Sequence, residues 1–238
     1  MNYRLVLGIP VIGISLLLCT TGCSQQISTS KLEKYFESLD LEKAEDGDEY
    51  NDNYDFYTRD KWLGISTSLN QYVVLPDADS CQDNLKSHLI VGGKHSKNII
   101  SAIRYQQEEW NEDASYVVSG ICARFTDSDA AEDCFDNLSK YTSSQYEEDD
   151  FYYEEYEGED NNVSYIIVDT ELGGVFCMYL EKDTIFYIKA DFNGDSRDYN
   201  KFSELINGLC NEAGVISPLD VIERDLSQTN NSSADYDD

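Results

Sequence analysis

Positive charge is scarce in this chain. Its 238 residues include 17 Lys and Arg against 47 Asp and Glu, which gives a formal net charge of -30. This balance disfavours nucleic acid and anionic lipid headgroups as partners, and it favours cationic or neutral ones. An acidic balance can also serve only to keep a domain soluble. Because 12% of the residues are aromatic, including 18 Tyr, the chain is nevertheless not a disordered acidic polymer.

Residue types and motifs of catalysis are also few. His88 and His95 are the two histidines, and there is no Gly-x-Ser-x-Gly elbow and no phosphate-binding glycine loop. Cys81 lies seven residues before His88, as His88 does before His95, but Gly92-Gly93 interrupts the helix that would align these three zinc ligands. We therefore expect no catalytic residue, cofactor or metal site. A hydrolase that uses paired carboxylates stays open as an alternative, because carboxylates are abundant.

Two short segments admit a ligand, but each has a simpler interpretation. Residues 92–97 form a compact basic loop whose amides and lysines can hold an anion, although a surface turn explains the same residues. Residues 191–195 match the opening of a calcium loop. Ser196, however, stands where that loop needs a glycine, and Phe202 where it needs an acid. A strand end followed by a turn and a helix cap accounts for this segment.

A long apolar run is present at the start of the chain. It covers residues 5–18, follows the single cation Arg4 and contains Gly8, Pro10 and Gly13. A membrane-spanning helix needs about 20 largely apolar residues, so this run is short for that purpose. It predicts a cleaved signal peptide.

The run ends in Thr20-Thr21-Gly22-Cys23. This segment resembles the lipobox of bacterial lipoprotein precursors, in which small residues precede a cysteine that receives diacylglycerol before cleavage ahead of it. The resemblance implies a signal peptide over 1–22, lipidation of Cys23 and a place on the extracytoplasmic face of the cell membrane. Two acyl chains, at about 0.8 kcal/mol per buried CH₂, hold a protein stably. Ordinary secretion through the same signal is the alternative.

Five cysteines remain after this processing: Cys81, Cys122, Cys134, Cys177 and Cys210. In an exported protein this odd number allows two disulfides and leaves one thiol over. Alternatively, all five are small buried hydrophobic residues. The sequence does not choose between these interpretations and indicates no connectivity.

Residues 23–30 read as a short tether, and residues 31–225 as one domain or two similar halves. Four helices are expected. Apolar residues at helical spacing predict helices that begin near Ser30, Thr126 and Ser196, and a shorter helix is expected over 80–89. Segments rich in β-branched and aromatic residues predict strands over 72–75, 99–105, 116–125, 163–168, 175–180 and 184–192, of which the last three suit an antiparallel meander. Together they predict an α+β fold, with an antiparallel sheet and helices packed mainly on one face. The acidic tail over 226–238 is expected to be disordered.

Two strand-to-helix segments resemble each other. Ala123 and Phe125 precede Phe135 at the same offsets by which Ala190 and Phe192 precede Phe202. This spacing is compatible with an internal duplication in which two equivalent helices cover one face of the sheet, but any strand-turn-helix unit places aromatics at similar intervals.

The most distinctive segment covers residues 146–162, where nine carboxylates stand among tyrosines without one cation. Carboxylates attract and orient a partner, and tyrosine rings suit cations or sugar rings. The candidate binding residues are Tyr152, Tyr153, Tyr156, Glu154 and Glu155. The alternative is an edge strand and loop whose charges discourage edge-to-edge aggregation.

These observations favour a membrane-tethered, extracytoplasmic binding or interaction domain without catalytic activity. Its partner would be cationic, a carbohydrate or another envelope protein. Two alternatives are an envelope-associated hydrolase and a structural component of an envelope complex, which would expose a large apolar patch.

Overall fold

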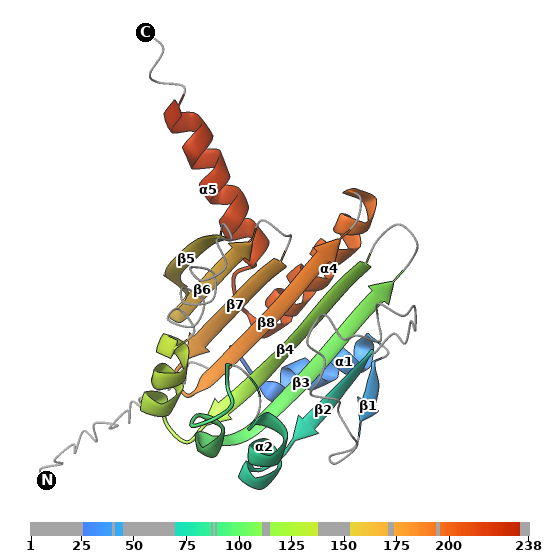
Figure 1. Cartoon of the computed structure of the whole chain (residues 1–238), viewed down its shortest axis with the longest axis vertical. Coiled ribbons are helices and arrows are strands. Elements are labelled where there is room, and N and C mark those ends of the chain that lie inside the picture. Colours follow the sequence, from blue (N-terminus) through green and yellow to red (C-terminus); the bar gives the residue numbers. More distant parts are fainter. Residues whose placement is uncertain are drawn as a thin grey trace, which may run out of the picture.

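The chain forms one eight-stranded sheet in the residues that the computed structural model describes, which are 26–39, 41–44, 70–86, 88, 90–110, 115–137, 153–170, 174–193 and 196–233. The strand order is β1-β2-β3-β4-β8-β7-β6-β5 (Figure 1). Only the β1–β2 pair is parallel among these strands, and the predicted α+β class is confirmed. The strands are β1 (Glu42–Ala44), β2 (Gln71–Leu75), β3 (Ile99–Trp110), β4 (Ser115–Phe125), β5 (Tyr153–Asp160), β6 (Val163–Thr170), β7 (Gly174–Glu181) and β8 (Thr184–Asn193).

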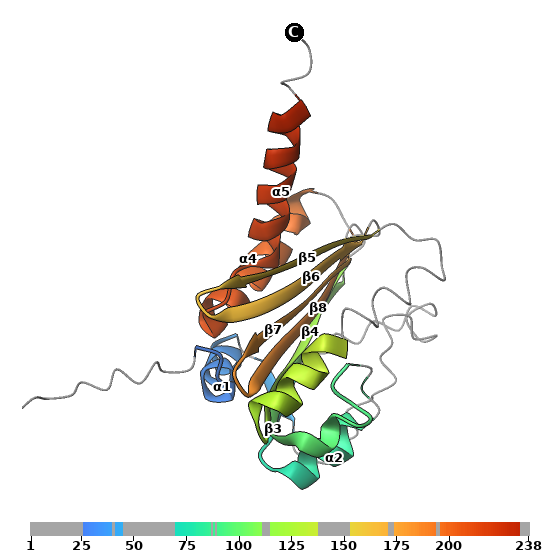
Figure 2. The ribbon, with the colours of Figure 1, turned by 90° about the vertical axis from the view of Figure 1, so that its left-hand side faces the viewer.

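Helices cover both faces of the sheet (Figure 2). One face packs against α1 (Thr29–Ser38) and α4 (Ser196–Ala213), whose Phe36 and Phe202 enter its core. The other face packs against α2 (Ala78–Leu85) and the helix over 128–137, through Leu85 and Cys134. A short 3₁₀ helix, η2 (Ser96–Asn98), precedes β3.

This arrangement differs from the expectation of helices mainly on one face, and β8 gives the reason. Ile185 and Tyr187 are buried on one side of the strand, while Phe186 and Ile188 are buried on the other. A strand with large apolar side chains on both sides needs cover on both sides.

The two similar strand-to-helix segments also differ in their surroundings. Ala123 of β4 packs on the face with the helix over 128–137, whereas Ala190 of β8 packs on the face with α4. The two helices therefore lie on opposite faces, and they are not equivalent helices over one face. All the described strands belong to one sheet.

Local sequence explains several boundaries. The Asp77 side chain accepts a hydrogen bond from the Ser80 N–H at 2.9 Å and caps α2. Gly214, with φ of +73°, ends α4 in the left-handed region that favours glycine. Pro218 begins α5 (Pro218–Ser233), because the first position of a helix needs no N–H donor. α5 continues through residues 226–233, for which the sequence predicts disorder.

The five cysteines of the described residues, which are Cys81, Cys122, Cys134, Cys177 and Cys210, form no disulfide and are buried. They serve as small apolar residues of the two cores, which agrees with the interpretation that all five are small buried hydrophobic residues. Burial raises the pKa of the Cys134 and Cys210 thiols to about 12 and raises that of Cys122 further. These thiols are therefore protonated at neutral pH and poor nucleophiles.

Several sequence predictions fall outside the described residues. They are the signal peptide over 1–22, the lipidation site Cys23, the candidate residue Tyr152 and the last residues of the tail. The last part of the predicted tether over 23–30 belongs to the folded domain, because Ile27 is buried in the core and α1 begins at Thr29. Among the described helices, none combines the length and apolar character needed to cross a membrane.

Candidate functional site

The candidate binding strand, β5, forms one edge of the sheet. It pairs with β6 in one unbroken register from Tyr153 opposite Thr170 to Asp160 opposite Val163. The connecting turn uses Asn161 and Asn162 at φ of 52° and 64°. Asn tolerates this left-handed backbone, which suits a tight hairpin of two residues. Of the two interpretations of residues 146–162, the one that predicted an edge strand is therefore correct in its strand assignment for residues 153–160.

Strand alternation divides the candidate residues between the two faces of the sheet. Tyr156 packs against the core that contains α1 and α4, whereas Tyr153 packs against the core that contains α2. Because successive side chains alternate, Glu154 shares the face of Tyr156, and Glu155 shares that of Tyr153. The described candidate residues do not form one aromatic surface. The odd spacing between Tyr153 and Tyr156 could have indicated this once the segment was taken as a strand.

On the α4 side, Tyr156 joins a group of carboxylates. Its hydroxyl donates to Glu154 Oε2 at 2.5 Å. Burial, followed by the hydrogen bond and charge of Glu154, raises the pKa of Tyr156 far above its usual value, with smaller contributions from Asp225 and Asp169. Asp169 lies directly opposite Glu154, and burial together with the Glu154 charge raises the Asp169 pKa. This side of β5 is therefore strongly negative, and a cation next to it would relieve repulsion between the carboxylates.

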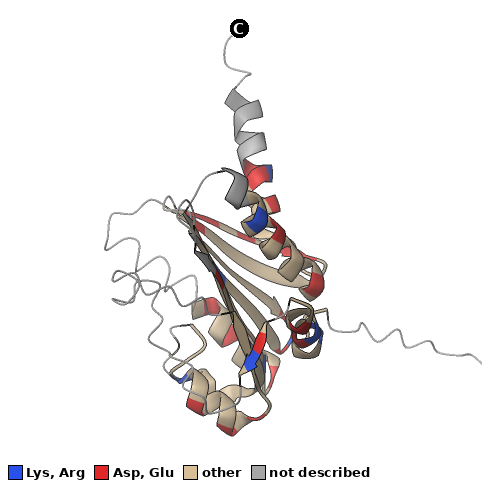
Figure 3. Cartoon of the chain, turned by 90° about the vertical axis from the view of Figure 1, so that its right-hand side faces the viewer, with Lys and Arg blue, Asp and Glu red and all other residues tan. Residues whose placement is uncertain are grey.

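The half of β5 next to the turn exposes two carboxylates. Glu157 and Glu159 are exposed to solvent, and Gly158 lies between them beneath the Tyr165 ring of β6. A side chain at Gly158 would collide with that ring, so the glycine permits a close approach. Carboxylates are spread widely over the described elements (Figure 3). What distinguishes β5 is the combination of five carboxylates, no cation and an edge position.

Sequence reasoning missed a polar row on β3. The side chains of Arg104, Gln106 and Glu108 are buried and alternate along the strand with apolar residues such as Ile103 and Tyr105. The Gln106 amide donates to Glu108 Oε1, and Arg104 donates to the Asn84 carbonyl oxygen of α2 at 3.1 Å. Alternating polar residues at positions 104, 106 and 108 are the signal that could have found this row.

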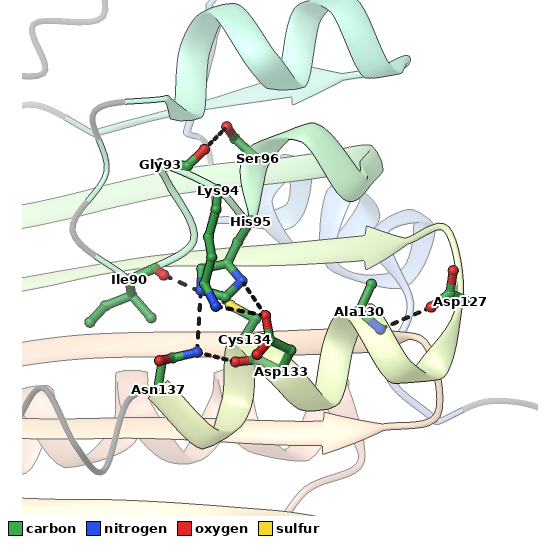
Figure 4. A network of polar contacts seen from close by, with 10 residues as sticks. All are labelled: Ile90, Gly93, Lys94, His95, Ser96, Asp127, Ala130, Asp133, Cys134 and Asn137. Carbon is green, nitrogen blue, oxygen red and sulfur yellow. Dashed lines mark hydrogen bonds and ion pairs between the residues drawn. The ribbon is translucent and has the colours of Figure 1, made fainter.

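The basic loop over 92–97 packs against the helix over 128–137 (Figure 4). Lys94 Nζ lies 2.9 Å from Asp133 Oδ2, and His95 Nδ1 lies 3.7 Å from the same oxygen. On the other side of the ring, His95 Nε2 lies 3.4 Å from the Asn137 amide nitrogen. The Asn137 amide can donate to the unprotonated Nε2 of a neutral ring, whereas Nδ1 lies beyond hydrogen-bond distance of Asp133. The loop therefore uses its basic groups to hold the helix, and Lys94 is not a free anion ligand.

Cysteine, histidine and asparagine near one another invite comparison with thiol catalysis. Here, however, Cys134 Sγ donates to the Ile90 carbonyl oxygen at 3.8 Å, and burial raises its pKa to about 12. Burial and the Lys94 charge lower the His95 pKa, while Asp133 raises it by a smaller amount. A protonated thiol held by a backbone carbonyl does not act as a nucleophile at neutral pH. We conclude that these contacts attach the loop over 92–97 to the helix over 128–137.

The three zinc candidates are separated by their own contacts. Cys81 Sγ donates to the Leu75 carbonyl oxygen at 3.8 Å, and His88 Nδ1 accepts from the Ile90 N–H at 3.2 Å. Within the described ranges, His, Cys, Asp and Glu side chains do not gather in groups of three or more that could hold a metal ion.

Comparison with known proteins gives little. No protein-family model and no curated protein matches this chain. Among solved structures, the chain is similar to the extracellular domain of PknH from Mycobacterium tuberculosis, with 10% sequence identity and a TM-score of 0.32. The similarity covers 65% of this chain and 89% of that chain. A similarity of this size carries no argument about function.

Proposed function

We propose that this protein is a membrane-tethered lipoprotein whose extracytoplasmic domain binds, without catalysis, an extended cationic segment of an envelope partner along β5. The lipid anchor rests on the resemblance of residues 20–23 to a lipobox. The observation that supports binding is that β5 is an eight-residue edge strand with five carboxylates and no cation.

An edge strand can bind a peptide through its backbone. In an antiparallel pair, alternate residues turn their N–H and C=O groups toward the neighbouring strand, and the remaining residues turn theirs outward. An added strand forms main-chain hydrogen bonds with these outward groups. The part of β5 that suits such pairing is Tyr156–Asp160, which keeps a continuous register with β6 and contains no proline. At the opposite edge of the sheet, β1 has three residues and offers far less length.

The charges of β5 determine which partner strands can pair with its edge. A second copy of β5 would place carboxylates opposite carboxylates, which is destabilising, so the edge resists pairing with itself. A strand with Lys or Arg at alternate positions would instead meet Glu157 and Glu159, which are exposed on one face. The same charges that protect the edge from aggregation therefore admit a cationic partner.

A peptide-binding experiment separates strand pairing from simple charge attraction. The probe is a capped nine-residue peptide of alternating Lys and Val, and its control has the same sequence with alternate backbone amides N-methylated. Binding to the full-length protein is measured by fluorescence anisotropy at several salt concentrations. We expect the unmethylated peptide to bind, the methylated one to bind at least tenfold more weakly, and binding to weaken with salt. Equal binding of both peptides would refute strand pairing, and failure of the unmethylated peptide to bind would refute the cationic partner.

Matched variants locate the site. Glu157→Gln with Glu159→Gln should weaken peptide binding by about 2- to 30-fold, which corresponds to roughly 0.2–1 kcal/mol for each exposed ion pair. Glu204→Gln with Glu212→Gln removes two exposed carboxylates from α4 instead and should leave affinity nearly unchanged. Equal weakening by the two pairs would mean that net charge, and not β5, attracts the peptide.

A further inference from the structure

The start of the domain is fixed by a buried carboxylate that lies 155 residues further along the chain. Glu181, the last residue of β7, is only 6% exposed. Its Oε2 accepts hydrogen bonds from the Gln26 N–H at 2.7 Å and the Ile27 N–H at 2.9 Å. Ile27 itself is 1% exposed and belongs to the core beneath α1 and α4. Hydrogen bonds to an ionised acceptor are stronger than those between neutral groups, so this contact holds the backbone firmly.

Further contacts hold Gln26 on the same end of the molecule. Its side-chain amide donates to the Asn161 carbonyl oxygen at 3.1 Å, and Lys31 Nζ donates to its carbonyl oxygen at 3.0 Å. Gly214 leaves room for the Gln26 side chain, because a Cβ at position 214 would come within 3.1 Å of the Gln26 Cβ. The β5–β6 turn, the end of α4 and the start of α1 thus surround the point where the domain begins (Figure 2).

Cys23 precedes Gln26 by three residues. Three fully extended residues span at most about 11 Å. A lipid on Cys23 would therefore lie within this reach of Gln26, and the domain would have no long flexible tether. A linker of about 20 Gly and Ser residues, by contrast, has a typical end-to-end distance of roughly 25 Å and leaves a domain free to turn.

We infer that the lipid holds the molecule in a preferred orientation, with the β5–β6 turn and the end of α4 toward the phospholipid headgroups. This inference rests on the proposed lipidation of Cys23. Exposed side chains at this end include Asn161, Asn162 and Lys182, which are neutral or positive in a protein of net charge -30. Asp183 of the adjacent turn pairs with Arg124 at 3.0 Å. Glu159 of β5 and Glu212 of α4 are also exposed near this end, so the short connection to Cys23, and not attraction between charges, sets the orientation.

The orientation determines how a partner meets β5. The strand ends at the turn next to Gln26, so its Asp160 end faces the membrane and its Tyr153 end points away. A cationic segment that pairs with β5 would extend outward from the membrane surface.

Two asparagines on α4 provide matched positions for the test. Asn200 and Asn211 are both exposed, and Asn211 lies near Gly214 at the end that contacts Gln26. The rise of an α-helix separates the two positions by about 16 Å along the axis. Asn200→Cys and Asn211→Cys can each carry a fluorophore, because the five natural thiols of the described chain are buried. The lipidated full-length protein is reconstituted in phosphatidylcholine vesicles that contain a nitroxide-labelled phosphatidylcholine as the quencher.

We expect the Asn211 label to be quenched at least twofold more than the Asn200 label. Insertion of 20 Gly and Ser residues between Ser24 and Gln25, which leaves the Glu181 contact intact, should bring the ratio toward one. Glu181→Ala should also reduce the ratio, whereas Glu204→Gln should not. Equal quenching of both labels in the unmodified chain would overturn the fixed orientation while the lipid anchor stands. Failure of the protein to sediment with vesicles would overturn the anchor and the orientation together.

Discussion

Replacement of Phe202 by Ala should lower the free energy of unfolding by about 3–5 kcal/mol. Phe202 is 1% exposed in the core between α4 and the sheet. Its ring centroid lies 5.3 Å from that of Phe192 and 6.4 Å from that of Tyr116. The substitution removes both aromatic contacts, each worth about 0.5–1.5 kcal/mol, and leaves a cavity that the surrounding strands cannot fill.

Phe135 provides the comparison. It is only partly buried against the other core. Full burial of such a side chain contributes about 1.5–3 kcal/mol, so Phe135→Ala should have a smaller effect, about 1–2 kcal/mol. The measurement is urea denaturation of a form that begins at Ser24, with Glu204→Gln as an exposed control expected to change stability by less than about 0.5 kcal/mol. A change below about 1 kcal/mol for Phe202→Ala, or an equal change for both phenylalanines, would refute the assignment of the α4 core.

Three further predictions concern other contacts. His95 is buried with a lowered pKa, so its contribution to stability should be complete above about pH 6.5, the usual value of an unfolded histidine, and should be lost as the pH falls through the lowered folded-state pKa. His95→Gln should remove this part of the pH dependence in denaturation curves, and an unchanged pH profile would contradict the buried neutral ring. Glu181→Ala leaves two backbone N–H groups without their acceptor, so it should lower the free energy of unfolding by about 2–5 kcal/mol, whereas a loss under about 1 kcal/mol would argue against the contact. In a form that begins at Ser24, a maleimide reagent should modify the thiols slowly in the folded protein and rapidly in urea, and fast labelling of the folded protein would contradict the burial of Cys81, Cys122, Cys134, Cys177 and Cys210.

Much of the fold follows from local sequence patterns. β-Branched and aromatic residues over 163–192 predicted the antiparallel meander of β6, β7 and β8, and these strands pair as expected. The helix after Ser196 was also predicted correctly. The cover on both faces was not, although the uninterrupted apolar run at residues 185–188 lacks the alternation of a strand with one buried side.

Contacts between distant segments have no local signal. Gln26 and Glu181 are 155 residues apart, and no sequence pattern around either residue predicts that the Glu181 carboxylate will accept a hydrogen bond from the Gln26 N–H. Lys94 and Asp133 are 39 residues apart. Because they pair, the loop over 92–97, a candidate anion site in the sequence, instead attaches to the helix over 128–137. The candidate strand β5 was identified from composition, but the division of Tyr153 and Tyr156 between two faces required the strand assignment.

Metabolic labelling with a fatty acid tests the proposed anchor most directly. The full-length chain and its Cys23→Ser variant are expressed in a bacterial host with a labelled fatty acid, and both the label and the mature N-terminus are determined by mass spectrometry. The account predicts that the wild-type chain begins at Cys23 and carries the label, while the variant carries none. Equal labelling of both chains, or an unlabelled wild-type chain that begins elsewhere, would contradict it.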